Sequence, residues 1–200
     1  MVRKPKFKYD KDLRVQGFFE RLAKYQCGDI DRFREQVEEQ RARKIETAHK
    51  LAAELPAEIE GFLSDELREI DTISGLADEL SIVALYRVVE LNTARIVVYE
   101  FGPAAKQKAS RIDGVKDLLM KNMGLKLETV PHYRAINELR LLNNAIKHEG
   151  VVSDDLAKAF PRWKRGSALS GLDKAYKRLG PRVPIYILRL SERMKLKYKS

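Results

Sequence analysis

The sequence has few of the residues that cross-link or interrupt a polypeptide chain. It contains one cysteine, Cys27, with seven prolines and eleven glycines among 200 residues. A single cysteine excludes an internal disulfide and a thiolate-cluster metal site, and it suits a reducing compartment such as the cytoplasm. No apolar run approaches the roughly 20 residues of a membrane-spanning helix, and no apolar segment follows the basic N-terminus as in a signal peptide. We therefore expect a cytoplasmic protein without a membrane segment.

Common catalytic motifs are also absent from the sequence. The three histidines, His49, His132 and His148, have no metal-ligand spacing, and no HExxH motif occurs. There is no phosphate-binding P-loop, no dinucleotide-binding glycine pattern and no local signature of a serine or cysteine nucleophile. These absences predict a protein that uses neither a metal ion nor an organic cofactor.

Positive charge is present in excess. Lys and Arg total 39 against 29 Asp and Glu, so the formal net charge is +10. Such an excess favours a polyanionic partner, and nucleic acid is the first candidate.

Apolar residues recur at helical spacing along most of the chain, which predicts an all-α fold. The predicted helices cover about 11–26, 29–56, 57–71, 75–101, 105–123, 131–150 and 153–160. Further on, residues 171–180 form a helical turn or two, and the tail 183–199 is either a terminal helix or a pair of strands. No internal repeat or low-complexity segment is present.

Turn-forming residues suggest where these helices begin and end. Gly28-Asp29 separates the first two helices, and Ser74 caps the hydrophobic helix 75–101, which Gly102-Pro103 ends. Gly124 ends the helix 105–123, and Ser153-Asp154 starts the helix 153–160. The segment before Pro56 is so charged that it is typical of an arm. We expect three parts: a basic tail and helical arm (1–56), a helical bundle core (57–150), and a basic loop with a helical extension (151–200).

The segment RLLNNAIKHEG, residues 140–150, places polar groups along one side of a helix. Arg140, Asn144 and His148 recur every four residues, and Asn143 and Lys147 form a second row beside them. The side expected to be buried carries Ile136, Leu139, Leu142 and Ile146. Guanidinium, amide, imidazole and ammonium groups together suit a phosphate. The alternative is that Lys147 and His148 only stabilise the helix end through its dipole.

This segment, preceded by ALYRVVELNTARIVV, resembles the HEPN superfamily of helical nucleotide- and RNA-binding domains. The resemblance covers about residues 74 to 150. Asn144 and His148 match the polar residue and the histidine of the family motif, and Arg140 matches an additional arginine one turn upstream. Asn143 stands where the family motif has its arginine.

The resemblance implies a metal-independent endoribonuclease of toxin or defence type, with two motifs facing each other across a homodimer. His148 would then assist proton transfer at the ribose 2′-OH, while Arg140 and Asn144 stabilise the phosphate. Two alternatives stay open. One is a catalytically inactive HEPN scaffold that binds RNA or a protein partner such as an antitoxin. The other is a structural adaptor whose arm, residues 29–54, pairs with another helix.

Other residues support an RNA-binding interpretation. In the basic loop FPRWKRG, Arg162, Trp163 and Lys164 are candidates for phosphate contacts and base stacking, together with Asn143 and Lys147 on the motif helix. The terminal segments RKPKFKY and KLKYKS have the same character, with Tyr198 as a second stacking candidate. Glu90 is a candidate supporting residue that pairs with Arg140, Arg87 or Arg95, unless it is simply solvated.

Overall fold

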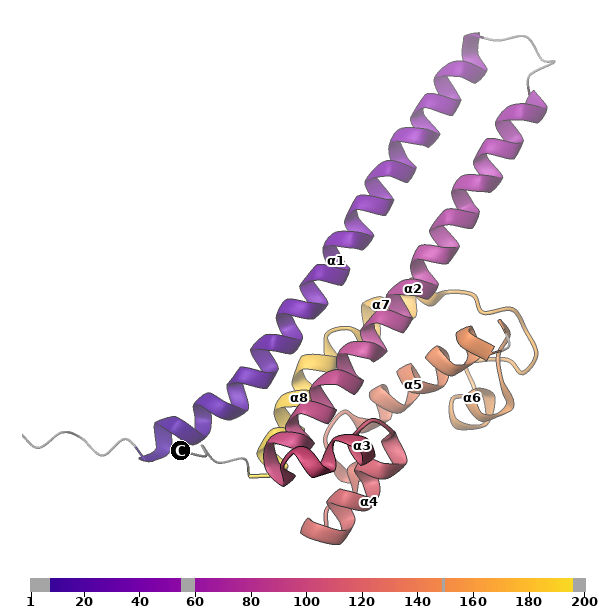
Figure 1. Ribbon diagram of the computed structural model, residues 1–200. Coiled ribbons are helices and arrows are strands. Elements are labelled where there is room, and N and C mark those ends of the chain that lie inside the picture. The colour runs from indigo at the N-terminus through magenta and orange to yellow at the C-terminus, as the bar shows by residue number, and fades with distance from the viewer. Residues whose placement is uncertain (1–7, 55–59, 149, 196–200) are drawn as a thin grey trace, which may run out of the picture.

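The computed structural model describes residues 8–54, 60–148 and 150–195, and it confirms the all-α prediction (Figure 1). Within these ranges the only β-type pairing is an isolated bridge between Val151 and Ala168. The α-helices are α1 (Lys8–Glu54), α2 (Glu60–Phe101), α3 (Lys106–Ala109), α4 (Ile112–Met123), α5 (Tyr133–His148), α6 (Asp154–Ala159), α7 (Leu172–Leu179) and α8 (Arg182–Arg193). Two 3-10 turns, Pro103–Ala105 and Leu127–Thr129, connect them.

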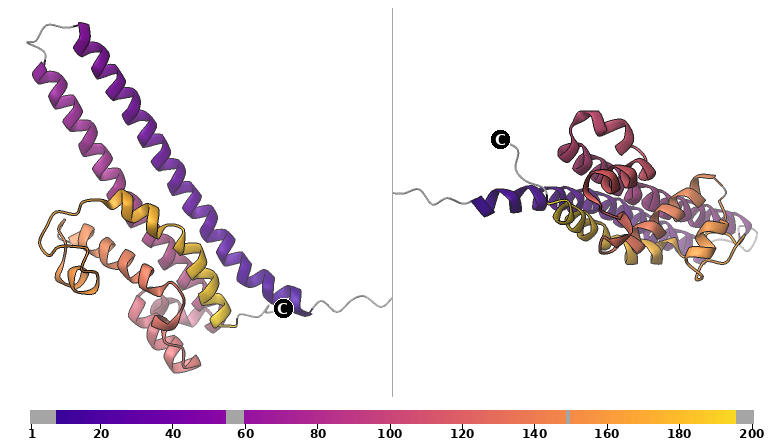
Figure 2. Two further views of the ribbon diagram at one scale, coloured as in Figure 1. Left: turned by 180° about the vertical axis from the view of Figure 1, so that it is seen from behind. Right: turned by 90° about the horizontal axis from the view of Figure 1, so that it is seen from below.

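The two longest helices form an antiparallel hairpin that projects beyond the rest of the molecule. Figures 1 and 2 show α1 and α2 side by side, with α3 to α8 packed along the part of the hairpin that holds the start of α1 and the end of α2. A rise of about 1.5 Å per residue makes each helix roughly 60 to 70 Å long, far more than a small bundle can cover. One end of the hairpin is therefore packed in a core, and the other is exposed on most sides.

The predicted break at Gly28-Asp29 is wrong, because α1 continues through it. A Cβ placed on Gly28 would meet nothing within 4 Å, so this glycine marks neither a turn nor a close contact. Its helix-weakening effect is about 1 kcal/mol relative to alanine. Burial of the neighbouring Cys27 and Ile30 outweighs that cost.

The predicted start of a helix at Ser74 is also wrong. The segments 57–71 and 75–101 form a single helix from Glu60, and Ser74 and Gly75 lie inside it. Two ion pairs between α1 and α2 flank this position: Arg41 to Asp71 at 3.0 Å and Arg34 to Asp78 at 2.6 Å. The seam with α1 thus keeps α2 helical where the local sequence favoured a cap. The predicted end of the helix before Gly102-Pro103 is correct.

The predicted helix 105–123 is interrupted at Ser110 and Arg111, where Arg111 takes an extended conformation. The chain then folds back so tightly that a Cβ on Gly114 would lie 2.2 Å from the Lys108 carbonyl oxygen. Gly114 therefore permits the close approach of α4 to α3. The helix ends as predicted, since Gly124 is left-handed and its N–H bonds to the Met120 carbonyl at 3.0 Å.

The described part of the predicted tail, residues 183–195, is helical as far as Arg193, which favours the terminal helix over the pair of strands. Its helix α8 packs along α1 and α2, and no strand pair forms in residues 183–195. Ser153 caps α6 as predicted, because its Oγ accepts the Leu156 N–H at 3.3 Å. Residues 160–171 connect α6 to α7 as a loop.

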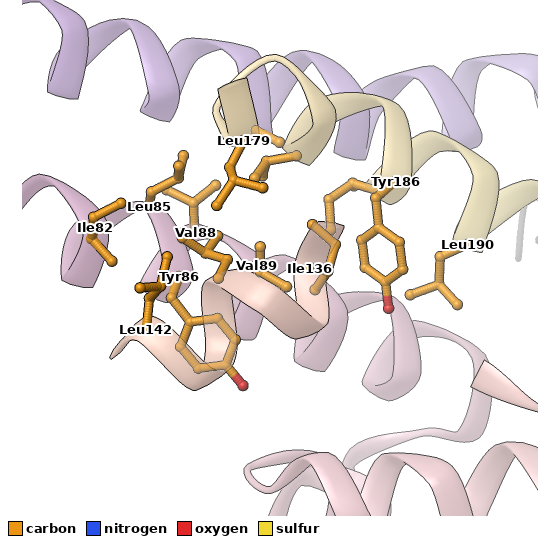
Figure 3. Packing of buried hydrophobic residues seen from close by; sticks show 14 of the residues in the cluster. Ile82, Leu85, Tyr86, Val88, Val89, Ile136, Leu142, Leu179, Tyr186 and Leu190 are labelled. Carbon is orange, nitrogen blue, oxygen red and sulfur yellow. The ribbon is translucent and has the colours of Figure 1, made fainter. Parts of the chain in front are cut away.

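A single core draws its side chains from the first part of α1, from α2 beyond residue 81 and from the later helices of the described chain. It includes Phe19 of α1, Leu85 of α2 and Leu139 of α5, all buried. Figure 3 shows Leu179 of α7 beside Leu85 and Tyr186 of α8 beside Ile136, with α2 running through the centre. The N-terminal and C-terminal segments therefore share one core with the helices between them, and this core holds α5 in place.

Candidate functional site

The helix α5 divides into a buried side and a rim at its C-terminal end. Ile136, Leu139 and Leu142 are buried as predicted, and Ile146 is half-buried. Asn144, Lys147 and His148 are exposed. The helix ends with the Gly150 N–H bonded to the Ala145 carbonyl at 2.9 Å, and Gly150 has a positive φ. A basic last turn also complements the helix dipole, so part of this arrangement is structural.

Arg140 lies one turn before the exposed rim and is half-buried. Its Nε and Nη2 both donate to Oδ1 of Asn137, at 3.1 and 3.0 Å. This two-point contact fixes the plane of the guanidinium before any ligand binds. A preorganised guanidinium loses less entropy when it binds an anion than a freely rotating one does.

The Arg140 side chain borders a small hollow between α2, the α3–α4 turn and α5. Its accessible volume is about 30 Å³, which is room for one or two water molecules. Its walls are mainly apolar, and its polar groups come from Tyr86, Glu90, Thr93, Ser110, Arg111, Tyr133, Asn137 and Arg140. Burial raises the pKa of Tyr86 to about 12; the Glu90 carboxylate adds to this rise and Arg140 opposes it. The Tyr86 hydroxyl therefore stays protonated at neutral pH.

Glu90 is half-buried and has Arg87 as its ion-pair partner, at 3.4 Å. Of the three arginines considered for this carboxylate, the structure therefore pairs it with Arg87. Glu90 and Arg140 both line the hollow, which therefore has one acidic and one basic group in its wall.

Asn143 lies apart from the exposed rim, because it is buried. Its Nδ2 donates to the Asn144 Oδ1 at 3.4 Å, and its own Oδ1 has no hydrogen-bond partner in the described part of the chain. Position 143, where the family motif has arginine, thus points into the protein. Asn143 therefore touches Asn144 from inside the protein, but it is not exposed on the rim with Asn144, Lys147 and His148.

The basic loop after α6 is attached to α5 through a buried carboxylate. Glu138 is only 2% exposed, and it accepts hydrogen bonds from Arg178 Nη1 and Nη2, at 2.9 and 2.8 Å, and from Trp163 Nε1 at 2.9 Å. Arg162 lies 3.8 Å away. Trp163 is half-buried against the core, whereas Lys164 is exposed. Arg162 and Trp163, predicted to contact RNA, therefore also hold this loop on α5.

Sequence reasoning missed Glu138 and Arg178, although one signal was present. Glu138 occupies the helical row of Ala135, Leu142 and Ala145, which is otherwise apolar. A carboxylate in such a row needs a cation, and several arginines were equally eligible. Burial alone would raise the pKa of Glu138, but hydrogen bonds from Arg178 and Trp163, with the charges of Arg178 and Arg162, bring it below its ordinary value.

Several predicted features lie outside the site or outside the described residues. The terminal basic stretches, residues 1–7 and 196–200 with Tyr198, belong to the latter. Among the residues that the structure describes, no group of three or more His, Cys, Asp or Glu side chains is arranged to hold a metal ion. In the same residues no helix combines the length and apolar character needed to cross a bilayer.

Comparison of the chain with models of protein families, with curated proteins and with solved structures finds no match.

Proposed function

We propose that this protein is an HEPN-like RNA-interacting protein that contacts single-stranded RNA through the C-terminal rim of α5. The observation that carries the proposal is the exposed group of Asn144, Lys147 and His148, one turn from the preorganised Arg140. Lys147 and Arg140 supply charge for phosphate, and Asn144 and His148 supply hydrogen bonds. The net charge of +10 adds a long-range attraction for a polyanion.

Binding without catalysis is what the side-chain arrangement favours. A buried amide at position 143 leaves the rim without the arginine of the family motif, so less positive charge faces the phosphate as negative charge develops during cleavage. Cleavage is a second candidate, because His148 is exposed one turn from Asn144. There the imidazole would take the proton from the 2′-OH while the 2′-oxygen attacks phosphorus, and the 5′-oxygen would leave and take a proton from water.

The test is titration of a fluorescent single-stranded RNA at several salt concentrations, with EDTA present. Affinity should fall as salt rises, with a log–log slope of roughly −0.7 per phosphate contacted. Lys147→Ala should weaken binding and reduce that slope by about one contact. The matched control is Lys121→Ala, since Lys121 is an exposed basic residue in the last turn of α4 and should have no effect.

The same samples distinguish a binding protein from a nuclease. His148→Ala should leave RNA affinity nearly unchanged, and the RNA should remain intact with the unmodified protein. If the unmodified protein cleaves RNA in EDTA and His148→Ala does not, the enzyme interpretation replaces the scaffold. Absent RNA binding, or equal losses from Lys147→Ala and Lys121→Ala, would contradict the proposed site and favour the adaptor.

A further inference from the structure

Exposed apolar side chains are concentrated on the α1–α2 hairpin. Nine large hydrophobic residues of the described chain are exposed, and seven of them belong to these two helices. Ile73, Leu76 and Leu80 lie close together on α2, with 45%, 54% and 49% of their surface exposed. Together with the half-buried Val83 they recur at intervals of three, four and three residues. This is the spacing of a helix that packs lengthwise against another helix.

This row, which we call the α2 stripe (Ile73, Leu76, Leu80 and Val83), is distinct from the seam with α1. The seam residues of α2 in this region, Ile70, Ala77 and Ser81, are buried. The stripe is a second apolar row on the same helix, and α1 leaves it largely uncovered.

Charged residues continue the spacing of the α2 stripe at both ends. Glu69 lies four residues before Ile73 and Arg87 four residues after Val83, and both are exposed. An antiparallel copy of α2 centred on position 78 places Leu76 opposite Leu80 and Ile73 opposite Val83. The same register places Glu69 of one copy opposite Arg87 of the other. A parallel copy would instead put Glu69 beside Glu69 and Arg87 beside Arg87, so charge favours the antiparallel arrangement.

We propose that the α2 stripe is the interface of an antiparallel homodimer of this protein. A two-fold axis makes the contact self-complementary, since every pair occurs twice. Arg87 is 3.4 Å from Glu90 in the monomer, a loose contact that leaves its guanidinium able to reach Glu69 of the partner subunit. The next pair in this register places Glu66 of one copy opposite Glu90 of the other. Both are acidic, so the interface ends there. This proposal does not depend on RNA binding.

The first test is sedimentation velocity over a range of protein concentrations. The unmodified protein should dimerise, and the double variant Leu76→Asp with Leu80→Asp should bind itself at least about 100-fold more weakly. Both leucines are about half exposed in the monomer, so the variant should keep its helical circular dichroism. The control is Met120→Asp with Met123→Asp, which changes comparably exposed residues of α4 (46% and 37%) and should still dimerise.

Orientation is tested by charge reversal and by cross-linking. Glu69→Arg and Arg87→Glu should each weaken the dimer, and combining them should restore it. A mixture of Leu76→Cys and Leu80→Cys proteins should form a disulfide-linked heterodimer faster than either forms a homodimer. The native Cys27 should not compete, because burial, followed by the charge of Asp31, raises the pKa of its thiol to about 12.

Three results would overturn the proposal. The first is an unmodified protein that stays monomeric at every concentration, which would leave the stripe to another protein. The second is a dimer that still forms in the double variant Leu76→Asp with Leu80→Asp. The third is a double charge-reversal variant that dimerises more weakly than either single variant, which would exclude the antiparallel register.

Discussion

The two ends of the α1–α2 hairpin differ in how many neighbouring helices pack against them. The hairpin arm, residues 31–54 and 60–81, contributes no residue to the core cluster, and its buried side chains include Ala48, Ile70 and Ala77 at the seam. The body, which is the rest of the described chain, surrounds α2 with α1, α5, α7 and α8. Ile82, Leu85 and Ile96 of α2 are there completely buried. In the arm, α2 therefore packs against a neighbouring helix on one side only, whereas in the body it packs on several sides.

This difference separates the roles of local sequence and tertiary packing. In the arm, helix continuity depends on one narrow seam and on ion pairs such as Arg41–Asp71 that are partly exposed and individually worth under about 1 kcal/mol. In the body, the helices share one large apolar core. The arm should therefore tolerate substitution and open locally, while the body should lose stability with each core change.

The largest effect should come from truncating a leucine in the body. Leu85→Ala removes a completely buried side chain and should lower the free energy of unfolding by about 3 to 4 kcal/mol. Leu80→Ala, five residues earlier on the same helix and 49% exposed, should lower it by less than about 0.5 kcal/mol. Urea unfolding at low protein concentration, where self-association is minimal, measures both. Similar losses from the two variants would remove the distinction between arm and body.

The next effect concerns the buried carboxylate of the body. Glu138→Gln removes the charge that Arg178, Trp163 and Arg162 surround, and it should cost about 2 kcal/mol at pH 7. The control is Glu128→Gln, because Glu128 pairs with Lys116 through a side chain that is 51% exposed, and its cost should be well under about 1 kcal/mol. Chemical denaturation of both variants at pH 7 gives the comparison, and equal costs would show that burial of Glu138 adds nothing.

The pH dependence of unfolding follows from the lowered pKa of Glu138. A folded-state pKa below the ordinary value means that this carboxylate stabilises the protein fully above its ordinary pKa. That contribution is lost as the pH falls through the folded-state pKa. The difference in stability between the unmodified protein and Glu138→Gln should therefore shrink in acid, in urea titrations repeated from pH 7 downward. A constant difference would show that the charge of Glu138 is not what stabilises the loop.

The smallest effect compares two glycines. Gly75 lies inside α2 in the arm, and a Cβ added there would meet nothing within 4 Å, so Gly75→Ala should raise stability by about 0.5 to 1 kcal/mol. Gly124 ends α4 in the body with φ +61°, so Gly124→Ala should lower stability by a similar amount. Thermal unfolding followed by circular dichroism measures both signs. A destabilising Gly75→Ala would indicate that the arm needs a flexible point there.

Helix ends were predictable where a residue has a strong backbone preference. Gly124, the Gly102-Pro103 pair and the Ser153 cap all act as predicted, because their effects are local. The predictions at Gly28 and Ser74 were wrong, since a glycine or serine weakens a helix by an amount that packing of its neighbours can outweigh. The break at Ser110-Arg111 is the converse case, where the close approach of α4 to α3 ends a helix that apolar periodicity favoured.

The candidate site was predictable in part. The four-residue spacing of Arg140, Asn144 and His148 did place them along one side of α5, but it could not separate exposed from half-buried positions. Asn143 lies inside the protein although its neighbour Asn144 is exposed, and this depends on how α5 docks. The binding of Arg178 and Trp163 to Glu138 joins residues 25 to 40 positions apart, so no local pattern contains it.

The sequence by itself determined that this protein is helical, which part of α5 is apolar, and where the strongest stop signals fall. Those properties depend on side-chain spacing within a few residues and on the backbone preferences of single residues. Only the tertiary structure decided that α1 and α2 run unbroken, that Glu138 holds the basic loop, and that the α2 stripe is left uncovered. Each of these depends on contacts between segments distant in the sequence, whose free energy exceeds the small local preferences that it overrides.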